Sequence, residues 1–174
     1  NAAKLDELAL AYVARYATSR GKLARYLSRK VAESKWIDDR SPEESIQMAI
    51  DRMESLKYLD DRQYAQMKSG AMMRRGLGLQ RVKAQLRFDG VTDSDREEAL
   101  VDQDQEILLA AVRFAQRRRV GPFATELLTD PAKKEKHIGA FIRAGHAHGL
   151  ARKILAMEPA EWPDPHQIAQ MLED

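Results

Sequence analysis

The stretch YLDDRQYAQMKSGAMMRRGLGLQRVKAQLRFDGV, residues 58–91, decides the fold. It predicts two helices joined by a short basic turn. Asp60 can cap the first helix, and Gly76 and Gly78 stand where that helix should end. A second helix should begin near Leu79 and end at Gly90.

The second helix of this stretch has an apolar stripe and cationic positions beside it. Leu79, Val82 and Leu86 recur at the spacing that places residues on one side of a helix. The cations between them should project into solvent, and they are Arg81, Lys83 and Arg87. The helical pair therefore has an apolar side that needs a partner and a cationic side.

Composition limits the class of protein. The chain has 174 residues, of which 44% are hydrophobic and 32% charged, so it can bury a core while keeping an elongated or high-surface shape. It has no cysteine, which excludes disulfides and thiolate chemistry and favours an intracellular, cytoplasmic setting. No apolar run approaches the roughly 20 residues of a membrane span. A net charge of +2 specifies no partner, but the charges are segregated along the chain.

Three helices are predicted before this stretch. Apolar residues recur at helical spacing over residues 5–17 and 22–31, and a basic turn joins these two helices. A polar connection, residues 33–40, precedes the third. Ser41-Pro42-Glu43-Glu44 is a capping-box start for a helix that runs to about Leu56.

The pattern continues after it. Residues 92–95 should start a short helix with Ala99 and Leu100 buried. An amphipathic helix over residues 107–115 then ends in a third basic turn, and Asp130-Pro131 caps a helix that Gly145 ends. Its inward residues, and those of a last helix, are expected to be Ile138, Phe141 and Ile142, then Leu150, Ile154 and Leu155.

The chain also resembles itself. Residues 141–146 repeat residues 86–91 with the same spacing from apolar residue to glycine, and similarity over about 55 residues is typical of a repeat architecture. We therefore predict an all-α fold of three tandem three-helix units. They comprise residues 1–57, 58–103 and 104–157, and a C-terminal tail with a short helix follows at 158–174.

The central stretch resembles the RecX family of bacterial regulators of the RecA recombinase. The resemblance rests on residues 58–61, 64–65, 74–78, 81–82, 86 and 90–91, and it extends to residues 23–27 and 141–146. It implies an elongated, curved array of three-helix units that lies in the groove of the RecA–DNA filament, regulates recombination, DNA repair and the SOS response, and has no catalytic activity. Three positions depart from the family's usual residues: Lys68, Met72 and Leu79.

Three basic clusters are the candidate partner-binding or DNA-binding residues. Any one cation can be a solvated surface charge, but three clusters at equivalent turns of three units can form one cationic stripe. They are Arg20, Lys22, Arg25 and Arg29; Arg74, Arg75, Arg81, Lys83 and Arg87; and Arg117, Arg118 and Arg119.

Other chemistry has little support. Tyr12, Tyr16, Tyr26, Tyr64 and Phe88 fall mostly on or beside apolar stripes, so we expect them in the core rather than in a base-stacking platform. The four histidines, His137, His146, His148 and His166, lack the spacing of a metal site. Asp60-Asp61 and Asp38-Asp39 have no phosphate-binding glycine loop beside them. We therefore expect no catalytic site, no cofactor and no metal.

Two functions remain open. The chain is either a monomeric modulator of the RecA filament with weak non-specific DNA binding, or a stand-alone DNA binder that uses a helix pair like a helix-turn-helix. The second interpretation needs base-reading side chains at the start of a recognition helix, where the sequence offers Lys22, Arg25, Gln80 and Arg81.

Overall fold

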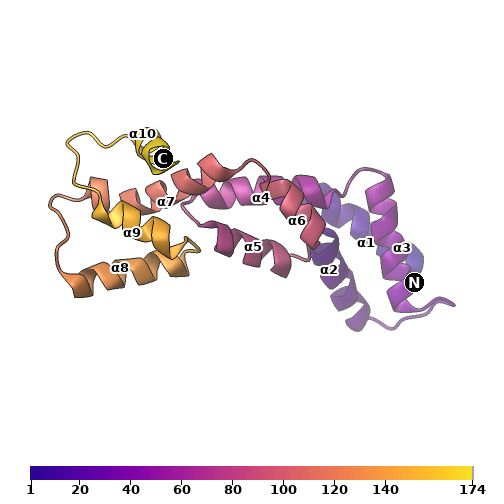
Figure 1. The fold of residues 1–174 in the computed structure, drawn as a ribbon. Helices are drawn as coiled ribbons and strands as arrows, with labels where there is room; N and C mark the ends of the chain where they lie inside the picture. Colours follow the sequence, from indigo (N-terminus) through magenta and orange to yellow (C-terminus); the bar gives the residue numbers. More distant parts are fainter. Residues whose placement is uncertain (174) are drawn as a thin grey trace. The chain divides into compact units, whose positions relative to one another are not determined.

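The structure is a computed structural model, and it describes residues 1–173. Within this range every regular element is helical (Figure 1). The all-α prediction is therefore confirmed. The helices are α1 (Ala2–Arg15), α2 (Arg20–Ala32), α3 (Pro42–Ser55), α4 (Asp61–Arg74), α5 (Leu79–Phe88), α6 (Asp93–Leu100), α7 (Asp104–Arg118), the 3₁₀ turn η1 (Gly121–Phe123), α8 (Pro131–Arg143), α9 (His148–Ala156) and α10 (Pro165–Glu173).

Side-chain caps begin the helices where the sequence predicts them. The Asp60 carboxylate accepts the Gln63 N–H at 2.9 Å, one residue before α4 starts. Ser41 and Glu44 form the expected capping box at α3. Asp130 caps α8 at the backbone of Ala132. These bonds satisfy N–H groups that have no partner inside the helix.

Glycines in the left-handed region end α4, α5 and α8. Gly76, Gly90 and Gly145 have φ values of 79°, 79° and 95°. The N–H of each bonds back to a carbonyl of the helix it ends, at 2.8 to 3.0 Å. A side chain at such φ values is strained, so glycine is the residue that permits these turns.

The chain divides into two compact units. The first contains residues 1–66 and 86–99, and the second contains residues 67–85 and 100–174. Helices α4 and α5 each begin in one unit and end in the other.

The core of the first unit lies among α1, α2 and α3. Leu23 and Leu27 of α2 are completely buried, and they contact apolar residues of the two neighbouring helices. Leu59, on the way to α4, closes the cluster. The buried members are Leu5, Ala9, Leu23, Leu27, Ile46, Ala49, Ile50, Met53 and Leu59.

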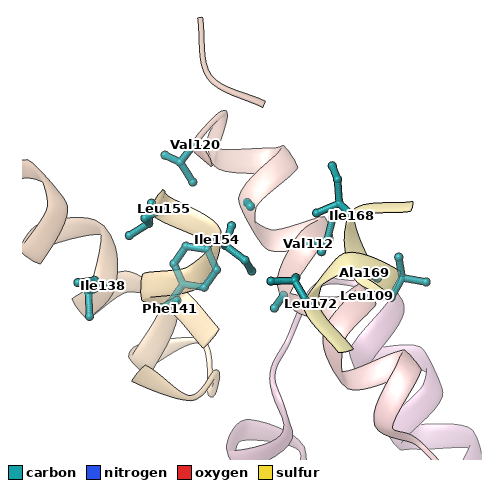
Figure 2. Close-up of a cluster of buried hydrophobic side chains, with 13 residues drawn as sticks. Leu109, Val112, Val120, Ile138, Phe141, Ile154, Leu155, Ile168, Ala169 and Leu172 are labelled. Carbon is teal, nitrogen blue, oxygen red and sulfur yellow. The ribbon is translucent and has the colours of Figure 1, made fainter. Parts of the chain in front are cut away.

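The core of the second unit joins α7, α8, α9 and α10 (Figure 2). Phe141 of α8 is completely buried and lies beside Ile154 of α9. The C-terminal helix α10 belongs to this core, because Ile168 and Leu172 pack with Val112 of α7. The short helix expected in the C-terminal tail is α10, and it covers one side of α7.

Within the first unit, the start of α2 packs backbone to backbone against the turn that ends α5. The Ser19 hydroxyl donates to the Asp89 carbonyl. A β-carbon added to Gly21 would lie 2.6 Å from the α-carbon of Gly90, closer than any real contact. Only glycines allow the two segments to meet in this way.

The second unit contains the equivalent junction one repeat later. The N–H of Gly78, directly before α5, donates to the Ala144 carbonyl at 2.8 Å. The Gln80 N–H donates to the Gly145 carbonyl at 3.1 Å. Asp89 and Ala144 both stand one residue before the glycine that ends the helix, so the same carbonyl is bonded at both junctions. The predicted helical repeat is present in the backbone contacts themselves.

Three side chains lie elsewhere than predicted. Ile142 is 49% exposed, because Ile138, Ala140 and Phe141 form the buried side of α8. Phe88 is 72% exposed at the end of α5, and Tyr16 is 50% exposed after α1. The expectation that the aromatic residues pack in the core is therefore wrong for these two, whereas Tyr64 is buried.

Candidate interaction surface

The cations of α5 are free to meet a partner. Val82 and Leu86 are completely buried, and Arg81, Lys83 and Arg87 lie off their stripe and are exposed. Lys83 and Arg87 are four residues apart, so they share one side of the helix. The nine ion pairs found among residues 1–173 involve none of the three.

Arg74 is the last residue of α4 and Arg75 directly follows it, at the end of a helix where cations are stabilised by the helix dipole. Both side chains are exposed. Their backbone carbonyls accept hydrogen bonds from the Arg117 guanidinium, at 3.1 Å in the case of Arg74. This contact brings part of the third cluster next to the second.

The third cluster does more than present charge. The Arg117 guanidinium is occupied by its hydrogen bonds to the carbonyls of Arg74 and Arg75. The Arg118 guanidinium lies 5.4 Å from the centre of the Phe114 ring, within cation–π range. Arg119 has a left-handed backbone with φ 53° and ends α7. Arg118 and Arg119 are exposed and are in no ion pair of the described chain.

Arg20 is a structural residue. Its guanidinium pairs with Asp51 at 2.8 Å and also with Glu54, so it joins the start of α2 to α3. The hydrogen bond from Arg20 lowers the pKa of Asp51. The sequence could not reveal this pairing, because the partners lie 31 and 34 residues away.

Lys22, Arg25 and Arg29 follow one side of α2 at intervals of three and four residues. Lys22 is half-buried, with its ammonium 5.5 Å from the centre of the Tyr64 ring. Arg25 and Arg29 are exposed. The Arg25 guanidinium lies 5.2 Å from the centre of the exposed Phe88 ring. Arg29 is held weakly, with its Nε 3.8 Å from Glu33.

Three buried polar side chains that the sequence did not single out as partners of α2 lie close to its first turn: Asp61, Tyr64 and Asp89. The Tyr64 hydroxyl donates to the Asp89 carboxylate at 2.7 Å, and burial raises the pKa of Tyr64. Asp61 accepts the Arg20 N–H at 2.7 Å, and its own burial raises its pKa. Through these bonds Asp61 and Asp89 contact the start of α2 and the side chain of Tyr64.

His146 is the buried histidine. Its Nε2 lies 2.9 Å from the Gly76 carbonyl, and its ring contacts Phe114 and Phe141. Burial lowers the pKa of His146, so the ring is neutral near pH 7 and donates from Nε2. It packs the second junction. Along residues 1–173 no three His, Cys, Asp or Glu side chains converge as a metal site would require.

None of the helices described here is both long and apolar enough to cross a membrane.

Comparison with known proteins gives a consistent set of matches. Residues 60–100, which form α4, α5 and α6, match the second three-helix domain of RecX. The regulatory protein RecX of Myxococcus xanthus is 29% identical over 161 residues, which is 90% of this chain and 86% of that protein. The regulatory protein RecX of Agrobacterium fabrum is 32% identical over 109 residues, 63% of this chain and 58% of that protein.

Solved structures agree in fold. The crystal structure of RecX from Lactobacillus salivarius aligns with a TM-score of 0.67 at 19% identity, over 88% of this chain and 93% of that one. A second crystal structure, of a regulatory protein RecX, aligns with a TM-score of 0.68 at 18% identity, over 88% of this chain and 70% of that one. At these identities the likeness concerns the fold of the helical repeats alone.

Proposed function

Because the chain belongs to the RecX family of regulatory proteins, we propose that it is a non-enzymatic inhibitor of the RecA recombinase. It binds in the groove of the RecA–DNA filament through a basic face and acts in the cytoplasm as a monomer. Its contribution is affinity for the filament, and the regulation of recombination and DNA repair follows from that binding.

The cations of α5 carry this proposal. Arg81, Lys83 and Arg87 are exposed and lack ion pairs within residues 1–173, so binding an acidic surface breaks no contact in this protein. Arg74 and Arg75 extend the same cluster. Arg118 and Arg119 add charge directly after Arg117, whose guanidinium contacts the backbone of Arg74 and Arg75. Arg20 and Arg117 position helices, and we assign them no direct contact.

The repeat boundaries fit this role. Each three-helix unit supplies a basic turn, and the glycine junctions join the second helix of one unit to that of the next. We propose residues 1–57, 58–103 and 104–157 as the repeating units. Residues 158–174 extend the third, since α10 shares its core.

Packing disfavours the helix-turn-helix alternative. Such a motif places the first turn of its recognition helix against base edges in the major groove. In this protein the first turns of α2 and α5 lie against the glycine turns that end α5 and α8. The backbone at Gly21 and Gly78 is therefore in contact with protein where the motif requires DNA.

A titration of RecA tests the proposal. RecA-dependent strand exchange and ATP hydrolysis on single-stranded DNA are measured as the protein is added at fixed RecA. We expect both to fall in a saturable way, with bovine serum albumin as the inert control. Undiminished strand exchange and ATP hydrolysis at saturating protein would refute the proposal.

A further inference from the structure

The first unit contains a concave site lined mainly by tyrosines and arginines. A cleft of about 390 Å³ lies between the end of α1 and the middle of α2, and we call it the tyrosine cleft. Its lining residues are Ala11, Tyr12, Arg15, Tyr16, Tyr26 and Arg29. Of these residues only Arg29 belongs to the three basic clusters.

The tyrosine cleft contains a stacked pair of rings with a third, tilted ring beside it. Tyr12 and Tyr26 are half-buried and stack with their centres 4.3 Å apart at an angle of 23°. The centre of the Tyr16 ring lies 5.1 Å from that of Tyr12, but the two rings are tilted by 51°, and Tyr16 is half-exposed. Tyr12 and Tyr26 pack against the core of the first unit, whereas Tyr16 is outside that cluster. One ring therefore presents surface that the fold does not use.

Two arginines lie over rings of the tyrosine cleft. The Arg15 guanidinium lies 5.7 Å from the centre of the Tyr16 ring, and that of Arg29 lies 5.8 Å from the centre of the Tyr26 ring. Glu33, which lies 3.8 Å from Arg29, also pairs with Lys30 at 2.7 Å, and none of the residues that line the cleft is acidic. The cleft therefore has a net positive charge and is suited to an anionic ligand that also has a flat ring.

The pattern continues along α2 beyond the cleft. Arg25 lies one turn before Arg29 on the same side of the helix, and it contacts the exposed Phe88 ring. Exposed rings alternating with cations are the arrangement that binds single strands, in which successive bases stack and the backbone meets positive charge. A ligand with one base would use only part of this surface.

We propose that the tyrosine cleft binds single-stranded nucleic acid by stacking a base on Tyr16, while Arg15 and Arg29 contact its phosphates. Bases of a duplex are stacked on each other and cannot reach the ring, so the site distinguishes single strands from duplexes. The inference goes beyond the proposed inhibition of RecA and does not depend on it.

The test uses the purified protein without recombinase. Fluorescence anisotropy measures binding of a labelled oligothymidine and of a duplex of the same length. The parent should bind the single strand more tightly, and Tyr16→Ala should weaken that binding by about 5- to 150-fold, the range for one lost base–aromatic stack. Duplex binding, which uses phosphates only, should change less than about twofold.

Two further variants separate stacking from folding. Tyr58→Ala removes another exposed tyrosine of the first unit, and it should leave both affinities unchanged. Tyr16→Trp supplies a larger ring and should restore binding. The proposal is overturned if Tyr16→Ala binds the single strand like the parent, if it weakens both ligands equally, or if tryptophan does not restore affinity. A mononucleotide that binds as tightly as the oligothymidine would overturn the claim that the ligand is a strand of several nucleotides.

Discussion

Replacement of Gly78 by alanine tests the repeat junction directly. The added β-carbon would lie 2.3 Å from the Gly145 carbonyl carbon, 2.4 Å from its oxygen and 2.5 Å from the His146 nitrogen. Carbon atoms in contact are normally about 3.5–4.0 Å apart. All three neighbours are backbone atoms, so no side-chain rotation can relieve the overlap and the two segments must separate.

The expected loss follows from this separation. Overpacking costs typically about 1–3 kcal/mol. The two hydrogen bonds across the junction, from Gly78 and Gln80, contribute about 1 kcal/mol each when they weaken. We expect the free energy of unfolding to fall by about 3 kcal/mol, which lowers the melting temperature of a chain of this length by roughly 6–12 °C.

Circular dichroism during thermal and urea unfolding measures the effect, and Gly149→Ala is the matched control. Gly149 lies in α9, and no heavy atom lies within 4 Å of its added β-carbon. Alanine there should stabilise the helix by up to about 1 kcal/mol. If Gly78→Ala melts at or above the temperature of the control, the close junction between α5 and α8 does not exist.

Three other predictions concern the buried stripe of α5, the buried histidine and the binding of duplex DNA. Leu86→Asp places a charge at a completely buried position of α5, and it should cost at least about 3 kcal/mol in urea unfolding, whereas Leu10→Asp, at an exposed position of α1, should cost less than 1; equal melting of the two would show the helix phase to be wrong. Burial lowers the pKa of His146 below its unfolded value of about 6.5, so its contribution to stability is present above that pH and is lost as the pH falls through the folded pKa. Stability should therefore drop between about pH 7 and 5 more steeply in the parent than in His146→Gln, and parallel profiles would remove His146 as the cause. Duplex binding should lack sequence preference and weaken steeply with salt, because phosphate neutralisation supplies its affinity; one duplex preferred tenfold over scrambled controls would contradict this.

Local signals made most of the fold predictable. Caps at Ser41, Asp60 and Asp130 and the end of helices at Gly76, Gly90 and Gly145 depend only on nearby residues, and each is present. The sequence pattern also identified the buried stripe of Val82 and Leu86.

The errors come from the margins of the stripes. Ile142 is one residue beyond Phe141 and lies at the edge of the buried side of α8, where about half of it is exposed. Phe88 lies two residues after Leu86, a separation of about 200° around a helix, so its hydrophobicity suggested burial that its position contradicts. Periodicity alone would have placed Phe88 correctly, whereas Ile142 fits the helical spacing and is still half-exposed.

The tertiary contacts of the candidate surface could not be read from the sequence. Arg20 and Arg117 look like solvated cations, and only folding brings Asp51 to the first and the carbonyl of Arg74 to the second. The tyrosine cleft is likewise lined by residues of both α1 and α2, and no local sequence motif predicts it. The structure shows which of the twelve predicted cations are exposed and unpaired. On that basis Arg20 and Arg117 are assigned to holding helices together rather than to direct contact with a partner.

Charge reversal on α5 tests the central claim most directly. The triple variant Arg81→Glu, Lys83→Glu and Arg87→Glu changes only exposed side chains. Its free energy of unfolding should therefore change by only a few tenths of a kcal/mol per site. The control variant Lys35→Glu, Lys133→Glu and Lys136→Glu makes the same change of charge at exposed positions outside the three clusters. Both are titrated against RecA-dependent ATP hydrolysis on single-stranded DNA at two salt concentrations. Inhibition should be retained by the control and lost by the folded α5 variant, with the difference larger at low salt. Inhibition by the α5 variant at the parent's concentration would show that these cations make no contact with the filament.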